Sequence, residues 1–242
     1  MHLLVTRPNE QAKQTALHLR QEGHTVTIEP LLEIFTKVEE RIPSASANPF
    51  SAIIVTSANA SEGLDVLWPL HERELVPVIT TGEATKNVLI SLGFKKCVSV
   101  NGSALKLLDA VPQWMAEENL SIDDTIFYPC AYQMAHDLEK ELKTMGIHCV
   151  SRAIYHARPQ TKFSNNVVTM LMENRVDGVL LYSARTAETF VSLMDKYQLP
   201  LDQLNTYVLS EQIFDSLPGL MKNNCPYPTE PSEAALFRLL RD

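Results

Sequence analysis

The chain of 242 residues contains little of what several kinds of binding site require. It has eight glycines, and the glycine-rich motifs that hold phosphates and dinucleotides do not occur. The motifs G-x-S-x-G and H-E-x-x-H are also missing, and the seven histidines show no spacing typical of metal ligands. The sequence therefore gives no support to nucleotide-dependent, triad-hydrolase or zinc-protease chemistry, and we expect neither a metal nor another cofactor.

Cysteines and long apolar segments are scarce as well. The four cysteines lie far apart without a C-x-x-C pair, so we expect reduced thiols in a reducing compartment. The longest apolar runs, such as residues 52–55 and 179–181, are far shorter than the roughly 20 residues of a membrane span. The N-terminal apolar run ends at Arg7 and Pro8, too early for a signal peptide. We predict a cytoplasmic protein without a membrane segment.

Positive charge is the third shortage, because 21 Lys and Arg residues stand against 29 Asp and Glu residues and give a net charge of −8. This balance disfavours non-specific attraction to nucleic acid or to an anionic membrane. An anionic ligand must therefore be held by local groups. With 45% hydrophobic and 21% charged residues, the composition is that of an ordinary globular protein.

Short apolar or β-branched runs alternate with stretches of helical period along the whole chain. This alternation is typical of α/β proteins with parallel sheets flanked by helices. The first unit predicts a strand over Leu3–Thr6, a helix over Asn9–Gln21 and a strand over Thr25–Glu29. The apolar side of that helix is expected to comprise Ala12, Ala16, Leu17 and Leu19.

A weak internal repeat relates the two halves of the chain. Three pairs of segments match, and their offsets rise from 123 through 126 to 129 residues, as small loop insertions would cause. The pairs are Ala16–Val26 with Glu139–Cys149, Ile53–Ala58 with Val179–Ala184, and Ser103–Leu105 with Ser232–Ala234. We therefore predict two similar α/β lobes.

Small hydroxyl residues end several predicted strands immediately before a helix begins. They are Thr6, Thr56 with Ser57, Thr80 with Thr81, Ser183, and Ser210. Each one alone also suits a plain helix N-cap, and that interpretation stays open. In parallel sheets, however, ligands gather at the carboxyl ends of strands, where helix N-termini attract anions. The repeated pattern on two lobes predicts a polyanion site in a cleft.

Five short motifs occur in order along the chain. They are Val5-Thr6-Arg7-Pro8 followed by Gln11, Leu19 and Gly23; Pro30–Ile34; Ile54–Ala60; Gly82–Thr85; and Ile154-Tyr155. In this order and spacing they resemble the uroporphyrinogen-III synthase family, and the resemblance runs nearly from end to end. The order and spacing together are more specific than any one motif.

The resemblance implies two similar lobes, each a parallel sheet flanked by helices, joined by a two-stranded connector. The first strand–helix–strand would belong to the C-terminal lobe, so one lobe would comprise residues 1–35 and 158–242 and the other residues 38–153. The connectors would be residues 35–37 and 154–158. Composition alone would divide the chain once, near Leu120.

The resemblance also implies a cofactor-independent lyase of tetrapyrrole and haem biosynthesis. Its small-molecule substrate would be hydroxymethylbilane, a linear tetrapyrrole octacarboxylate, with no nucleic acid or membrane as partner. The family reaction loses the terminal hydroxyl as water, and the resulting azafulvene is attacked at the substituted carbon of ring D. A spiro intermediate then breaks and recloses to uroporphyrinogen III with ring D inverted. We expect a monomer.

Site residues carry over by position. Tyr155 matches the family's catalytic tyrosine. The first loop of the family's cleft corresponds to Thr56, Ser57, Ala58 and Asn59, and its Gly-x-x-Thr turn corresponds to Gly82 and Thr85. These residues are expected to bind substrate around the tyrosine.

The match is weaker in the other lobe. Ser183 and Ala184 are kept, but Tyr182 stands where threonine is common. Ser210 begins a turn whose last residue is Ile213 in place of threonine, so only backbone N–H groups and the serine are expected to serve there. The cations considered for carboxylate pairing are Arg7, Lys86, Arg158 and Arg185, for each of which an exposed structural role is an equal alternative.

A second function stays open on the residues alone. A non-catalytic two-lobed binding protein that closes on an anionic metabolite would use the same architecture and the same hydroxyl-rich strand ends. Such a protein would bind its ligand without turnover.

Overall fold

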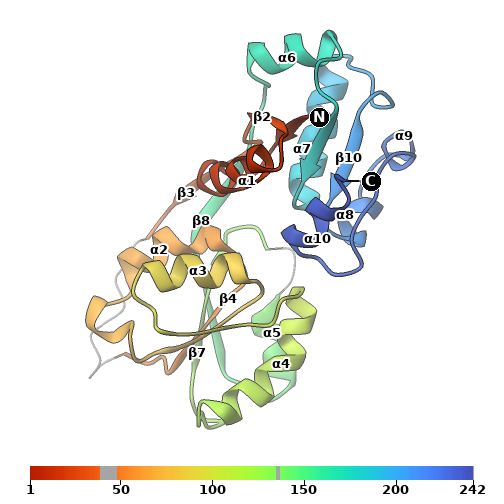
Figure 1. The fold of residues 1–242 in the computed structure, drawn as a ribbon. Helices are drawn as coiled ribbons and strands as arrows, with labels where there is room; N and C mark the ends of the chain where they lie inside the picture. Colours follow the sequence, from red (N-terminus) through yellow and green to blue (C-terminus); the bar gives the residue numbers. More distant parts are fainter. Residues whose placement is uncertain (39–47, 135–136, 242) are drawn as a thin grey trace. The chain divides into compact units, whose positions relative to one another are not determined.

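The computed structural model describes residues 1–38, 48–134 and 137–241 of the chain. It confirms an α/β fold with parallel sheets flanked by helices (Figure 1). The chain divides into two compact units: unit 1 is Met1–Glu33 with Arg158–Asp242, and unit 2 is Ile34–Ala157. Within unit 1 the N-terminal helix α1 (red in Figure 1) therefore belongs with the C-terminal helices (blue).

Unit 1 contains a four-stranded parallel sheet with the order β10-β9-β1-β2. The strands are β1 (His2–Val5), β2 (Thr25–Ile28), β9 (Gly178–Leu181) and β10 (Asn205–Val208). The helices are α1 (Asn9–Gln21), α6 (Asn165–Met172), α7 (Ala184–Lys196), α8 (Glu211–Asp215), α9 (Gly219–Lys222) and α10 (Glu233–Arg238). Helices α6 to α9 contribute to the core on one face of the sheet, and α1 and α10 to the core on the other.

Helix α1 has the bounds that its periodicity predicts, but one of its four apolar assignments is wrong. Ala12, Ala16 and Leu19 are fully buried, whereas Leu17 is 53% exposed. The reason is the 3.6-residue period: positions i, i+4 and i+7 share one face, and the residue after Ala16 is rotated about 100° away from it. The helix is followed by Gly23, whose φ of +89° favours glycine.

Unit 2 is built on β8, β7, β4, β5 and β6, which pair in parallel in that order. The strands are β4 (Ala52–Val55), β5 (Pro77–Thr80), β6 (Lys96–Ser99), β7 (Ile126–Ala131) and β8 (Cys149–Pro159). The helices are η1 (Ala58–Ala60), α2 (Ser61–Leu67), η2 (Leu70–Glu72), α3 (Glu83–Ser91), α4 (Ala104–Glu117) and α5 (Leu138–Thr144). One face packs on α4 and α5, and the other on α2 and α3.

Strand β3 (Leu32–Thr36) lies beside β8, and both strands cross the boundary between the units. The Lys37 N–H donates to the Ile154 carbonyl at 2.8 Å, and the Gln160 N–H donates to the Leu31 carbonyl at 2.9 Å. Because the residue numbers run in opposite directions, β3 and β8 are antiparallel.

The two sheets share one strand arrangement, since β2-β1-β9-β10 in unit 1 corresponds to β8-β7-β4-β5 in unit 2. The registers agree as well: Leu3 pairs with Gly178, and Ile126 pairs with Ala52. Leu3 precedes Ile126 by 123 residues and Gly178 follows Ala52 by 126, which are two of the offsets of the sequence repeat. The repeat in the sequence is therefore a repeat of structure.

Candidate functional site

The loop after β4 carries the first group of predicted site residues. Thr56 to Asn59 are all half-buried at the carboxyl end of the strand. The hydroxyls of Thr56 and Tyr128 are hydrogen-bonded at 3.1 Å, and the Thr81 hydroxyl donates to the Thr56 carbonyl at 2.9 Å. Ser57 caps helix η1 by accepting the Asn59 N–H at 3.2 Å. The loop is thus held by hydroxyl groups from β7 and from the end of β5.

A β-bulge brings Tyr155 to the same loop. Cys130 is opposite Ala153 and Ala131 is opposite Tyr155, so Ile154 is an extra residue in β8. In a regular strand side chains alternate between the two faces, so Tyr155 would lie on the same face as Ala153. Because of the extra residue, the Tyr155 side chain instead lies on the other face, in the core that contains Ile154. There Tyr155 makes a side-chain hydrogen bond with Ser57. The bulge therefore aims this phenol at the strand end.

Burial dominates the ionisation of Tyr155. It raises the pKa of the phenol, and a nearby cysteine, Cys130, raises it further, while the hydrogen bond with Ser57 lowers it. The net pKa lies above the usual value near 10, so the phenol is protonated at neutral pH. Tyr155 can donate a hydrogen bond or a proton but is not a base there.

Gly82 and Thr85 lie at the start of α3. Gly82 is the N-cap residue in an extended conformation, and nothing lies within 4 Å of the position that a Cβ would take. No side chain caps the first N–H groups of this nine-residue helix, which suits the approach of an anion. Thr85 is buried in the first turn. Lys86 pairs with Glu83 at 3.3 Å in the same turn.

Arg7 contacts other groups of unit 1. Its guanidinium donates to Glu233 at 2.8 Å and lies 4.2 Å from the centre of the Tyr182 ring. Glu233 also accepts hydrogen bonds from Thr15 at 2.5 Å and Tyr182 at 3.0 Å. Burial, followed by the charge of Glu233, raises the pKa of Tyr182 well above its usual value. This cluster joins the ends of β1 and β9 to the first turn of α10.

The remaining predicted residues of unit 1 begin helices. Ser183 caps α7 by accepting the Thr186 N–H at 3.1 Å, and Ala184 is the first residue of that helix. Ser210 precedes α8 without a side-chain capping bond, and Ile213 is buried. Arg185, in the first turn of α7, and Arg158, in β8, both interact with other groups of the protein.

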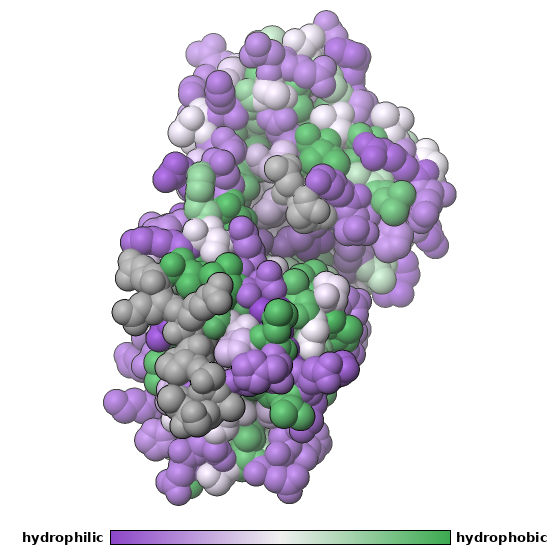
Figure 2. Space-filling view, turned by 90° about the vertical axis from the view of Figure 1, so that its left-hand side faces the viewer, coloured by the Kyte–Doolittle hydropathy of each residue, from purple (hydrophilic) through white to green (hydrophobic). Residues whose placement is uncertain are grey.

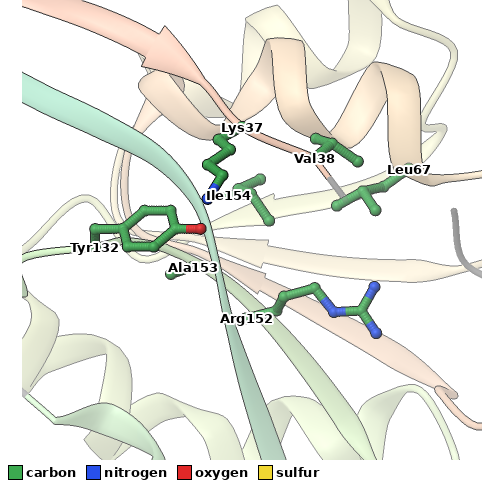
Figure 3. A pocket seen from close by; sticks show the side chains of 7 residues that line it. All are labelled: Lys37, Val38, Leu67, Tyr132, Arg152, Ala153 and Ile154. Carbon is green, nitrogen blue, oxygen red and sulfur yellow. The ribbon is translucent and has the colours of Figure 1, made fainter. Parts of the chain in front are cut away.

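Unit 2 also contains a pocket of about 320 Å³ beside β3 and β8. Its lining residues are Lys37, Val38, Leu67, Tyr132, Arg152, Ala153 and Ile154 (Figure 3). Tyr132 stacks on His156 with the ring centres 3.8 Å apart, and the Lys37 ammonium lies 5.6 Å from the Tyr132 ring centre. Four separate segments supply these residues, which is why sequence spacing gives no sign of the pocket.

The surface, the titratable groups and the helices add three findings. On the face in Figure 2, apolar residues gather in several separate patches among hydrophilic ones, as is normal for a protein surface. Within the described ranges, no three His, Cys, Asp or Glu side chains cluster as metal ligands do. None of the helices in that part of the chain has the length and apolar character of a membrane span.

Comparisons with known proteins concern nearly the whole chain. The sequence model of the HEM4 family, described as uroporphyrinogen-III synthase HemD, matches residues 13–238. A search of curated proteins finds no match. Among solved structures, uroporphyrinogen-III synthetase from Helicobacter pylori 26695 superposes with a TM-score of 0.59 at 16% identity, covering 100% of this chain and 99% of that one. A mutant uroporphyrinogen III synthase from the extremely thermophilic bacterium Thermus thermophilus gives 0.54 at 14% identity, covering 100% and 96%. At these identities the two structures show the shared fold.

Proposed function

The chain belongs to the uroporphyrinogen-III synthase family, and we propose that the strand ends of unit 2 around Tyr155 carry the chemistry of that family. Members of the family are cofactor-independent cyclising lyases of haem biosynthesis. Their reaction closes hydroxymethylbilane with loss of water and inversion of ring D to give uroporphyrinogen III. The observation that carries the assignment is the family match over residues 13–238.

Tyr155 is proposed as the group that assists loss of water. Its phenolic proton passes to the terminal hydroxyl while the pyrrole nitrogen supplies electrons, the C–O bond breaks, and water and the N-protonated azafulvene form beside the tyrosinate. The proton returns when the closed ring becomes aromatic again. The bulge that aims Tyr155 at Ser57 and the raised pKa of its phenol support a donor role.

The substrate carboxylates are proposed to bind at strand ends and helix starts. In unit 2 these are Thr56 to Asn59 and the uncapped N-terminus of α3 at Gly82 and Thr85. In unit 1 they are Ser183 with Ala184 and Ser210. Backbone N–H groups suffice to orient a flexible polyanion, and orientation alone can lower a barrier by several kcal/mol.

Arg7 can bind a substrate carboxylate only under one condition. Its guanidinium already donates to Glu233, so it can serve a substrate carboxylate only where that carboxylate replaces Glu233. An exchange of one carboxylate for another keeps the charge of Arg7 compensated.

We further propose that unit 1 and unit 2 are the two lobes of this fold, with β3 and β8 as connectors. Unit 1 comprises Met1–Glu33 and Arg158–Asp242, and unit 2 comprises Ile34–Ala157. The protein is expected to act as a monomer, because one chain supplies every residue of the proposed site. A cytoplasmic location is supported by the four free thiols, which are typical of a reducing compartment.

The test of the function is turnover with isomer analysis. Freshly made hydroxymethylbilane in large molar excess is incubated with the purified protein, and the oxidised products are separated chromatographically. We expect type III product in many-fold excess over protein. If only the type I isomer of spontaneous closure forms while the protein binds the substrate, the non-catalytic binding protein is the correct interpretation.

A further inference from the structure

Tyr128 carries a hydroxyl that the core does not need. It lies in β7, is 5% exposed and packs in the apolar cluster of Ile54 and Ile126. A phenylalanine would fill the same space, yet the phenol is hydrogen-bonded to Thr56 at 3.1 Å. Burial raises the pKa of Tyr128 to about 12, so this phenol stays protonated wherever the protein is folded at neutral pH.

Two tyrosines hold the loop after β4 from opposite faces of the sheet. Tyr128 belongs to the core on the α4 and α5 face, and Tyr155 belongs to the core on the α2 and α3 face. Tyr128 bonds to Thr56, and Tyr155 bonds to the next residue, Ser57. The position of the Tyr155 partner therefore depends on how Thr56 is held.

The equivalent place in unit 1 lacks this arrangement. At the repeat offset of 126 residues, Thr56 corresponds to Tyr182, which bonds to Glu233. At the strand offset of 123 residues, Tyr128 corresponds to Val5, which has no hydroxyl. In unit 1 the shared fold therefore forms this strand end although β1, the counterpart of β7, carries no phenol there. The Tyr128 hydroxyl is particular to the unit that contains Tyr155.

We propose that Tyr128 is a positioning residue, which fixes the Thr56 hydroxyl and through it the Ser57–Tyr155 pair in the geometry that favours ring inversion over direct closure. This inference rests on the proposed function. Tyr128 does not touch the substrate in this account. Its loss is expected to loosen the loop, lower kcat and let more substrate escape to the type I isomer.

The test compares Tyr128→Phe, Thr56→Val, the double variant and Thr56→Ser, with Tyr207→Phe as the matched control. Tyr207 is another buried tyrosine, in unit 1, whose hydroxyl lies 3.8 Å from the Met1 sulfur. We expect Tyr128→Phe to lower kcat about fivefold, as loss of one hydrogen bond would, with KM changed less and a larger type I fraction. The double variant should lose no more than Thr56→Val alone, and Thr56→Ser should lose less than Thr56→Val, while Tyr207→Phe should retain the wild-type kcat and isomer ratio.

Two results would overturn the inference: a wild-type kcat and isomer ratio in Tyr128→Phe, or losses that multiply in the double variant. If Tyr128→Phe does not fold, the pair Thr56→Val and Thr56→Ser decides, since equal activity in both removes any role for the hydroxyl. If the wild type forms type III isomer and Tyr128→Phe is unaffected, the inference about Tyr128 is refuted and the proposed function is not. A wild-type protein that forms only type I isomer refutes the proposed function and, with it, the inference.

Discussion

At the scale of single residues, the proposal depends on the Tyr155 hydroxyl. Tyr155→Phe keeps the buried ring and removes the group bonded to Ser57. A full general acid contributes about 10²-fold or more, but a phenol whose pKa is raised is a weak acid near neutrality. We therefore expect kcat to fall more than the several-fold loss of one hydrogen bond and less than about 10²-fold.

Steady-state kinetics with circular dichroism measure this, and Tyr207→Phe again serves as the control. A packing role for Tyr155 predicts unchanged kcat and KM in Tyr155→Phe with a lower melting temperature. That outcome would remove the phenol from the chemistry.

Sequence reasoning proposes Tyr155, Ser57 and Gly82 as site residues because they lie in local motifs, but it does not propose Tyr128. The partner of Tyr128 is 72 residues away, and their contact depends on the pairing of β4 with β7. The orientation of the Tyr155 side chain cannot be predicted from the sequence either, because it follows from an extra residue in β8 that no local pattern marks. Both features arise from sheet register.

At the scale of elements, the cluster around Glu233 attaches α10 to the ends of β1 and β9. Glu233→Gln removes the charge that compensates Arg7 and weakens the bonds from Thr15 and Tyr182. Because the Arg7 and Glu233 side chains are only 15% and 30% exposed, we expect a loss of about 1–3 kcal/mol in the free energy of unfolding.

Urea unfolding measures that loss, with Glu22→Gln as the matched control. Glu22 pairs with Arg241 at 2.6 Å, but the Arg241 side chain is 64% exposed, so this change should cost less than about 1 kcal/mol. Equal losses in the two variants would show that the Glu233 cluster stabilises the protein no more than an exposed ion pair does.

Helix α1 and the alternation of strands and helices can be predicted because periodicity and capping are local. The membership of β1, α1 and β2 in the C-terminal unit does not follow from composition, which places them with their sequence neighbours, and only the family resemblance implies it. The structure explains the difference: the repeat pairs β1 with β9, a contact between residues 175 apart such as Leu3 and Gly178. Long-range pairing of this kind leaves no trace in a single segment.

At the scale of the whole molecule, both units keep cysteines protonated. Burial is the main cause, and it raises the pKa of Cys149 to about 12, Cys225 to about 12 and Cys130 to about 11, against 9.0 for a free thiol. In the unfolded chain these thiols ionise near pH 9, whereas in the folded protein they do not. Their contribution to stability is therefore complete below about pH 9 and is lost as the pH rises toward 11–12.

Urea unfolding at about pH 8 and about pH 10.5 tests this, and Cys149→Ala should show a smaller decrease between the two than the wild type. An equal decrease in both proteins would mean that the Cys149 thiol does not contribute to the alkaline loss of stability.

The central claim is that the protein inverts ring D while it closes the tetrapyrrole. The most direct test uses hydroxymethylbilane carrying ¹³C at two bonded atoms, the substituted α-carbon of ring D and the methylene that joins it to ring C. In the spiro route this bond breaks and the methylene is joined to the other α-carbon, so we predict that ¹³C NMR of the enzymatic product shows no one-bond coupling between the two labels. A product formed only in the presence of the protein that retains this coupling would contradict the account.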